Sequence, residues 1–210
     1  MPTLLHVDSS PRGDRSHSRR LSGEVAAAYA AAHPGTRVVH RDVGHTPPPF
    51  MTETTVAGFY TPPADRTPEM QHAVAVSDRL VGELLDADTL VLGVPMYNFG
   101  VPAALKAWID QVVRIGKTFD FDPSLDNPYV PLVHGKQAFI ASVSGGAGYG
   151  EGGDLASMNH QVPYLQQVLG FIGITDVSVV RVENAMAGDE VLAEEFARAS
   201  GRTAELMGVA

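Results

Sequence analysis

The sequence predicts an α/β domain in which helices cover both faces of a doubly wound, five-stranded parallel sheet. Five short segments are apolar and rich in β-branched residues, which is typical of strands that are buried on both faces. Segments with apolar residues at helical spacing lie between them, and this alternation is typical of a parallel sheet. The length of 210 residues suits one domain, so we expect residues 1–210 to form a single unit.

Each strand and helix is predicted from its own pattern. The strands are TLLHVD (3–8), TRVVHRD (36–42), DTLVLGVP (88–95), QAFIASVS (137–144) and TDVSVVRVE (175–183). Five helices are predicted over residues 21–32, 73–84, 105–112, 161–170 and 192–206, and Pro163 suits the first turn of the fourth. The residues that set the helical periods are Leu21, Val25, Tyr29 and Ala32; Ala73, Ser77, Leu80 and Leu84; Leu105, Trp108, Ile109 and Val112; and Leu192, Phe196, Ala199, Thr203 and Leu206.

Two long segments, 44–69 and 116–136, do not fit this alternation. Both are rich in proline and aromatic residues. Connections of this length in a compact domain are usually functional lids or interaction surfaces. A surface excursion without a function is the alternative.

Composition argues against several classes of function. The net charge of −9 and the pI near 5.2 argue against nucleic acid or an anionic membrane surface as a partner. The sequence has neither an apolar run of membrane-spanning length nor a signal-peptide pattern, so a cytoplasmic protein is expected. It has no cysteine, and its eight histidines form neither HxH nor HExxH, so neither thiolate chemistry nor a metal site is expected. Redox chemistry would therefore belong to a bound cofactor.

The segment after the first strand is a candidate anion site, because ligands of doubly wound sheets bind at the carboxyl ends of strands. Serines there lead into a helix N-terminus, whose free N–H groups and dipole favour an anion. The serines are Ser9, Ser10, Ser16 and Ser18, and the neighbouring cations are Arg12, Arg15, Arg19 and Arg20. A phosphate monoester held mainly by neutral donors is one interpretation, and simple N-capping by Ser16 is the other.

The segment after the third strand, GVPMYNFGVPAALKAWID (93–110), carries bulky apolar residues where loops are usually polar. Asn98 or Gly100 could cap the following helix, but capping does not need Met96, Tyr97 and Phe99. Flat apolar side chains beside backbone N–H groups suit a planar heteroaromatic ring. A hydrophobic staple that fills the core is the alternative.

The segment after the fourth strand, SVSGGAGYGEGGD (142–154), is rich in glycine. It contains a formal GxGxxG at Gly148, Gly150 and Gly153. This motif follows the fourth strand and no clear helix opens directly after it, so we do not interpret it as a dinucleotide-binding fingerprint. Glycine instead allows backbone groups to approach the edge of a flat ligand closely.

Four segments together resemble the family of FMN-dependent NADH:quinone oxidoreductases, also called azoreductases. They are SSPRGDRSHSRRL, PMYNFGVPAALKAWIDQVVRIGKTF, SGGAGYGEG and PYLQQVLGFIGITDV, and the resemblance spans nearly the whole chain in order. It implies a flavodoxin-like fold and a homodimer with one FMN per subunit near the dimer interface. It also implies two-electron reduction of quinones, and reductive cleavage of azo compounds, with NADH or NADPH as the donor.

The resemblance implies roles for individual residues. Those implied to hold FMN are Ser10, Ser16, His17 and Ser18 at the ribityl phosphate, Met96, Tyr97, Asn98 and Phe99 along the isoalloxazine, and Ser144, Gly145 and Gly146 at its polar edge. No side chain is assigned to catalysis, because hydride transfer at the flavin N5 needs approach and alignment more than an acid or base. The candidates for the acceptor pocket are the aromatic residues Phe59, Tyr60, Phe119, Phe121 and Phe171. Phe171 would serve from the partner subunit, and core packing explains it equally well.

The sequence departs from the family pattern at two points. The family often has Ser-Arg-Gly-Gly after the fourth strand, whereas this chain has Val143, Ser144, Gly145 and Gly146, so the loop offers no arginine to a reduced flavin. His17 stands where a neutral amide or small residue is common, so we predict that phosphate affinity varies with pH.

The predicted mechanism is a ping-pong cycle in which NAD(P)H leaves before the acceptor takes its place. One alternative is an electron-transfer flavodoxin-like protein without NAD(P)H turnover. The two long aromatic segments argue against it, because they indicate a covered pocket. A regulatory protein of this fold without a cofactor is the second alternative.

Overall fold

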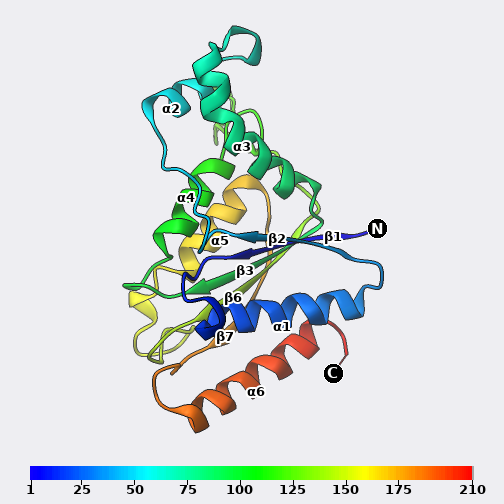
Figure 1. Cartoon of the computed structure of the whole chain (residues 1–210), viewed down its shortest axis with the longest axis vertical. Coiled ribbons are helices and arrows are strands. Elements are labelled where there is room, and N and C mark those ends of the chain that lie inside the picture. Colours follow the sequence, from blue (N-terminus) through cyan, green and yellow to red (C-terminus); the bar gives the residue numbers. More distant parts are fainter. Residues whose placement is uncertain (210) are drawn as a thin grey trace.

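Strands and helices alternate along the chain, as a computed structural model of residues 1–209 shows (Figure 1). The elements are β1 (Thr3–Asp8), α1 (His17–Ala32), β2 (Arg37–Asp42), α2 (Glu53–Tyr60), α3 (Pro68–Asp86), β3 (Thr89–Pro95), α4 (Ala103–Val112), β4 (Phe119–Phe121), β5 (Tyr129–Pro131), β6 (Gln137–Val143), α5 (Val162–Ile172), β7 (Asp176–Val182) and α6 (Asp189–Leu206). Single 3-10 turns lie at Gly13–Arg15, Pro63–Asp65 and Ala156–Met158. Among the described residues, no helix is both long and apolar enough to cross a membrane.

The five predicted strands form one parallel sheet in the order β2-β1-β3-β6-β7. Each observed strand ends within one residue of its predicted bounds. This is the flavodoxin-like strand order. The chain winds from β1 outward to β2 and then continues on the other side of β1 with β3, so the switch point of the topology lies between β1 and β3. The prediction of a doubly wound α/β domain is therefore confirmed, and the ligand site is expected beyond the carboxyl ends of β1 and β3.

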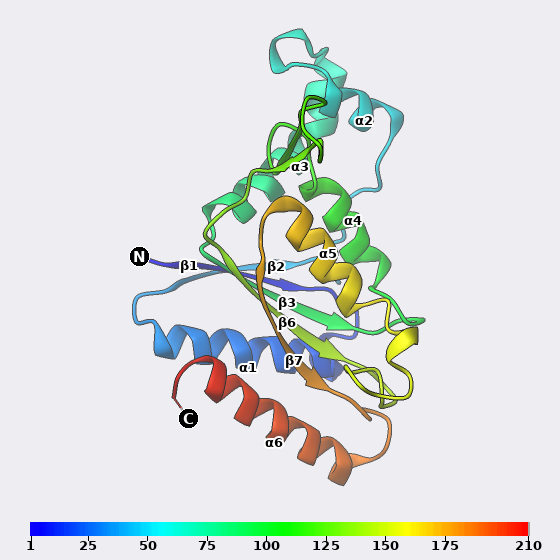
Figure 2. The ribbon, with the colours of Figure 1, turned by 180° about the vertical axis from the view of Figure 1, so that it is seen from behind.

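Helices cover both faces of the sheet. In Figures 1 and 2, α1 and α6 lie on one face, and α3, α4 and α5 lie on the other. Leu21 of α1 and Phe196 of α6 belong to the core on the first face, whereas Leu80, Trp108 and Leu165 belong to the core on the second. Each such apolar side chain stabilises the fold by about 1.5–3 kcal/mol when it is fully buried.

The two segments that were predicted to be irregular both contain regular structure. Segment 44–69 holds α2, which Thr52 caps by accepting a hydrogen bond from the Thr55 N–H at 3.2 Å. Segment 116–136 holds the antiparallel hairpin of β4 and β5. The prolines that flank these elements hid both of them in the sequence pattern. Figure 2 shows α2 and the hairpin near the same end of the molecule, on the side of α3 and α4.

The predicted helix starts are partly confirmed. Ser16 caps α1, as its hydroxyl accepts a hydrogen bond from the Arg19 N–H at 3.4 Å, and Pro163 lies in the first turn of α5. Capping of α4 by Asn98 or Gly100 was wrong. That helix begins at Ala103, after Pro102, because the chain first makes a tight turn at residues 97–100.

Candidate functional site

A cavity of about 310 Å³ lies at the carboxyl ends of the central strands. Four segments that are far apart in sequence form its walls. The lining residues are Ser10, Arg12, Ser16, His17 and Ser18; Pro95, Met96 and Tyr97; Val143, Ser144 and Gly145; and Ala185 and Met186. The ends of the first, third and fourth predicted strands therefore converge on one site.

Most of the predicted cofactor-binding residues meet in this cavity. Those that line it are Ser10, Ser16, His17, Ser18, Met96, Tyr97, Ser144 and Gly145. Asn98, Phe99 and Gly146 are not among the lining residues. Asn98 and Gly146 directly follow the lining residues Tyr97 and Gly145, and Phe99 lies in the same turn as Asn98.

The wall before α1, called the serine wall below, is a row of buried hydroxyl groups. Ser10, Ser16 and Ser18 are at most 4% exposed. The Ser10 Oγ accepts the Arg12 N–H at 3.3 Å, and the Ser16 and Ser18 hydroxyls lie 3.1 Å apart. Helix geometry leaves the first N–H groups of α1, those of His17 and Ser18, without carbonyl partners inside the helix. This wall can therefore donate several hydrogen bonds to an anion at the positive end of the helix dipole.

The arginines of this segment do not all face the cavity. Arg12 lines it. Arg19 instead makes a two-point contact with Asp42 (2.7 and 2.5 Å) and donates two hydrogen bonds to the Ser10 carbonyl (2.8 and 2.6 Å). Arg20 pairs with Glu24, and its guanidinium lies 3.7 Å above the ring of Phe196. Arg12 thus supplies positive charge to the cavity, whereas Arg19 fixes the backbone of the serine wall.

His17 is neutral at pH 7. Burial lowers its pKa, and the positive charges of Arg12 and Arg20 lower it further. The ring packs against the edge of Phe196, with 6.2 Å between centroids. In the folded chain it therefore places an uncharged ring at the wall.

The apolar wall stands on a tight turn at residues 97–100. The Tyr97 N–H donates to the Gly100 carbonyl and the Gly100 N–H donates to the Tyr97 carbonyl, both at 3.0 Å. The two central residues, Asn98 and Phe99, have φ angles of 48° and 68°. Both positive angles define a type I′ turn, in which Phe at the second central position is strained. Tyr97 and Phe99 remain 38% and 40% exposed, so a flat apolar surface faces solvent here.

The glycine-rich segment 142–154 is held in place by a carboxylate. Glu183 accepts the N–H groups of Gly148 and Tyr149 at 2.9 and 3.1 Å. The Ser144 hydroxyl donates to the Gly146 carbonyl at 2.8 Å. The only helical turn directly after this segment, among residues 1–209, is the 3-10 turn Ala156–Met158. The segment is therefore a fixed loop at the cavity rather than the start of a dinucleotide-binding helix.

Two lining residues were missed by the sequence analysis. Ala185 and Met186 follow β7, and the Met186 N–H donates to the Gly145 carbonyl at 3.2 Å. A Cβ added at Gly145 would lie 2.9 Å from the Met186 Sδ, so the glycine admits this side chain. The rule that ligands bind at the carboxyl ends of strands, applied to the fifth strand, would have found both.

The five predicted acceptor-pocket aromatics lie outside the cavity. Phe59 and Tyr60 line a separate pocket of about 330 Å³ between α2 and residues 114–117. Phe119 and Phe171 pack together, with 4.9 Å between centroids, and Phe121 stacks edge-on to Tyr129 at 5.7 Å. Within one chain these residues form two aromatic groups away from the serine wall.

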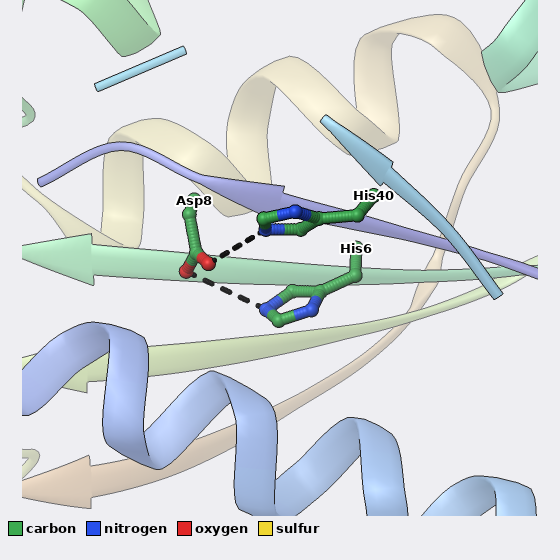
Figure 3. A group of neighbouring side chains, drawn as sticks. All are labelled: His6, Asp8 and His40. Carbon is green, nitrogen blue, oxygen red and sulfur yellow. Dashed lines mark hydrogen bonds and ion pairs between the residues drawn. The ribbon is translucent and has the colours of Figure 1, made fainter. Parts of the chain in front are cut away.

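A polar cluster of His6, Asp8 and His40 lies on β1 and β2, as Figure 3 shows. The Asp8 carboxylate accepts the Ser22 hydroxyl at 2.8 Å and lies 3.4 and 2.9 Å from the Nε2 atoms of His6 and His40. Burial acts to raise the pKa of Asp8, but hydrogen bonds from His6, His40 and Ser22 outweigh it and hold that pKa below its usual range. Asp8 is therefore an ionised carboxylate at neutral pH.

The chemistry that the cavity supports follows from its walls. Hydroxyl and N–H donors suit a phosphate, and the exposed flat surface beside them suits an aromatic ring. The Ser142 hydroxyl donates to the side-chain Oε1 of Gln161 at 2.6 Å, which commits it to the fold rather than to nucleophilic attack. The walls therefore favour binding and alignment of a ligand that is anionic at one end and planar at the other.

Comparisons with known proteins agree with this geometry. A family model described as a flavodoxin-like fold matches residues 2–206. "FMN-dependent NAD(P)H:quinone oxidoreductase 1" of Pseudomonas aeruginosa is 52% identical over 192 residues, which cover 90% of each chain. "FMN-dependent NADH:quinone oxidoreductase 1" of Pseudomonas fluorescens is 47% identical over 210 residues, which cover 98% of each chain. The crystal structure of an azoreductase from Bacillus anthracis superposes with a TM-score of 0.87 at 28% identity and covers 99% of both chains.

Proposed function

The chain belongs to the flavodoxin-like family of the FMN-dependent NADH:quinone oxidoreductases, and on this basis we propose that it reduces quinones and azo compounds, with FMN as cofactor and NADH or NADPH as donor. The observation that carries the proposal is the cavity at the carboxyl ends of β1, β3 and β6, which joins a hydroxyl wall to a flat apolar wall.

The residues present fit FMN. Ser10, Ser16 and Ser18, with the N–H groups that open α1, would hold the phosphate, and neutral His17 would complete that wall. The proposed contacts of the isoalloxazine are Met96 and Tyr97 on one wall and Ser144 and Gly145 at its polar edge. Asn98, Phe99 and Gly146 are proposed to act in the same walls by fixing the turn and loop on which these residues stand. The FMN-binding domain would comprise residues 1–210.

Bound FMN would supply the two-electron chemistry between the nicotinamide and the acceptor. The protein's part is alignment, so no side chain is proposed as an acid or base. Because donor and acceptor must both reach the same ring, we propose that they bind in turn, in a ping-pong order. Arg12 is the lining residue that can attract the anionic donor.

We propose that the protein is a cytoplasmic homodimer. The aromatic groups around Phe59 and Phe119 lie outside the cavity of their own chain, so they could serve as an acceptor pocket only beside the cavity of a second subunit. The proposed set is Phe59, Tyr60, Phe119, Phe121 and Phe171. Light scattering on a size-exclusion column tests the dimer, and a monomer that retains full activity would contradict it.

Turnover and flavin content test the proposed function together. The purified protein is expected to carry the visible absorbance of a flavin and to oxidise NADH or NADPH when benzoquinone is present. Tyr97→Ala should lose flavin, whereas Phe50→Ala, at an exposed ring outside the cavity, should keep it. Flavin without turnover on either nicotinamide would favour an electron carrier. A protein that takes up no added FMN would contradict the cofactor itself.

A further inference from the structure

Two histidines and an aspartate from adjacent strands meet at the start of the serine wall. His6 and Asp8 are two residues apart on β1, so their side chains share one face of the sheet. His40 on β2 pairs with His6 in the parallel register, which places its side chain on the same face. In Figure 3 the two rings lie one above the other, and each turns a nitrogen towards the Asp8 carboxylate. The ring centroids are 4.9 Å apart.

The donor atoms already have nearly the spacing of metal ligands. One nitrogen from each ring and one Asp8 oxygen all lie within 4.8 Å of one another. Ligands around a tetrahedral Zn²⁺, each about 2.0–2.2 Å from the ion, are separated by roughly 3.4 Å. The His6 Nε2 lies 3.4 Å from the Asp8 Oδ1, and the His40 Nε2 lies 2.9 Å from the Asp8 Oδ2. Because the His40 side chain is 49% exposed, its ring can move outward by the small distance that an ion requires.

The surrounding charges leave the Asp8 carboxylate available. Arg19 is the nearest cation, with 3.7 Å between its NH1 and Asp8. Its guanidinium is already neutralised by Asp42, which it contacts at two points. Ser22 donates to the Asp8 Oδ1 at 2.8 Å, which is the kind of outer hydrogen bond that orients a ligating carboxylate. The Ser22 Oγ also lies 2.9 Å from the His6 Nε2, a hydrogen bond that an ion at this nitrogen would replace.

We propose that His6, Asp8 and His40 form a binding site for a first-row divalent cation such as Zn²⁺, with further coordination positions filled by water. Two imidazoles with one carboxylate suit Zn²⁺ and its transition-metal neighbours and suit Mg²⁺ poorly, because Mg²⁺ prefers oxygen ligands in octahedral geometry. The ion would join β1 to β2 two residues before Ser10. This site is distinct from the FMN cavity, and its occupancy can be measured without turnover.

Zinc binding to the intact, tag-free, FMN-loaded protein tests the site. Metal is first removed with a chelator, and Zn²⁺ is then titrated calorimetrically at about pH 7.5, where imidazoles are mostly neutral. The wild type should bind one Zn²⁺ per chain, and its melting temperature should rise with zinc concentration. Mg²⁺ at the same concentrations should produce no such rise.

His40→Gln and His72→Gln provide the matched pair. Both replace an exposed histidine, but His72 lies on α3, away from the cluster. His40→Gln should weaken zinc binding at least tenfold, and its melting temperature without zinc confirms that it folds. His72→Gln should bind zinc as the wild type does. The proposal is overturned if the wild type binds no zinc, if His40→Gln binds it equally well, if His72→Gln weakens it as much, or if Mg²⁺ gives the same stabilisation.

Discussion

Replacing Phe99 by glycine and by alanine tests the strain in the turn at the apolar wall. Phe99 has a φ of 68°, in the left-handed region that residues with a Cβ rarely adopt. Its carbonyl accepts the His160 N–H at 2.9 Å, and the paired hydrogen bonds of Tyr97 and Gly100 close the turn. These contacts hold the backbone in place whatever the side chain at position 99 is.

The two variants lose the same ring, so the difference between them reports the backbone alone. A residue with a Cβ in the left-handed region costs about 1–2 kcal/mol relative to glycine. Glycine in turn lowers the free energy of unfolding by about 0.5–1 kcal/mol relative to alanine, because it makes the unfolded chain more flexible. Phe99→Gly should therefore unfold with a free energy about 0.5–1 kcal/mol higher than Phe99→Ala. In a regular helix or strand the order would be reversed.

Urea denaturation of the FMN-free variants, followed by circular dichroism and extrapolated linearly, measures this difference. Removal of FMN matters because different residual affinities would add their own stabilisation. If Phe99→Ala is as stable as Phe99→Gly or more so, the positive φ at position 99 costs no free energy and the reasoning is refuted.

Three further predictions follow from single contacts. Ser16→Ala removes the cap of α1, so unfolding free energy should fall by about 1 kcal/mol and FMN affinity should also fall. Thr67→Ala, at the cap of α3, should lose only stability, and equal FMN loss in both variants would contradict the serine wall. The lowered pKa of His17 means that the unfolded chain binds its proton more readily. The FMN-free wild type should therefore lose stability as pH falls through about 6.5, and His17→Gln should lose less. Urea titrations at several pH values measure this, and a loss in His17→Gln that equals or exceeds that of the wild type would contradict the prediction. Gly201→Ala on α6, where an added Cβ meets no atom within 4 Å, should raise the melting temperature by about 2–4 °C. Gly153→Ala, whose Cβ would clash with the Gly148 carbonyl oxygen, should lower the melting temperature. Equal shifts of the two variants in calorimetry would refute this contrast.

The sheet could be predicted because its strands are buried on both faces. Val91 of β3 and Ile140 of β6 are fully buried, and such strands appear in sequence as uninterrupted apolar runs. The serine wall was predictable for a similarly local reason, since its serines lie between a predicted strand and a predicted helix. The walls lie where the strands end, so the predicted strands and their order were sufficient to predict most of the cavity.

The features that the sequence analysis missed depend on contacts between distant segments. The cluster of His6 and His40 needs the register of β1 against β2, which no local spacing reveals. Arg19 looked like an anion-binding charge, but Asp42 and the Ser10 carbonyl occupy it. The helix α2 and the β4–β5 hairpin were hidden because prolines and short lengths weaken their periodic signals.

The positions of the cavity walls in the sequence set the order in which a newly made chain acquires them. The serine and apolar walls, up to Tyr97, are synthesised first, but Met186 follows about 90 residues later. At ribosomal rates of about 5–20 residues per second, roughly 4–18 s separate these walls. The cavity cannot be complete on a chain that stops after β6. Capture of the cofactor in the complete cavity therefore has to follow the synthesis of the segment after β7.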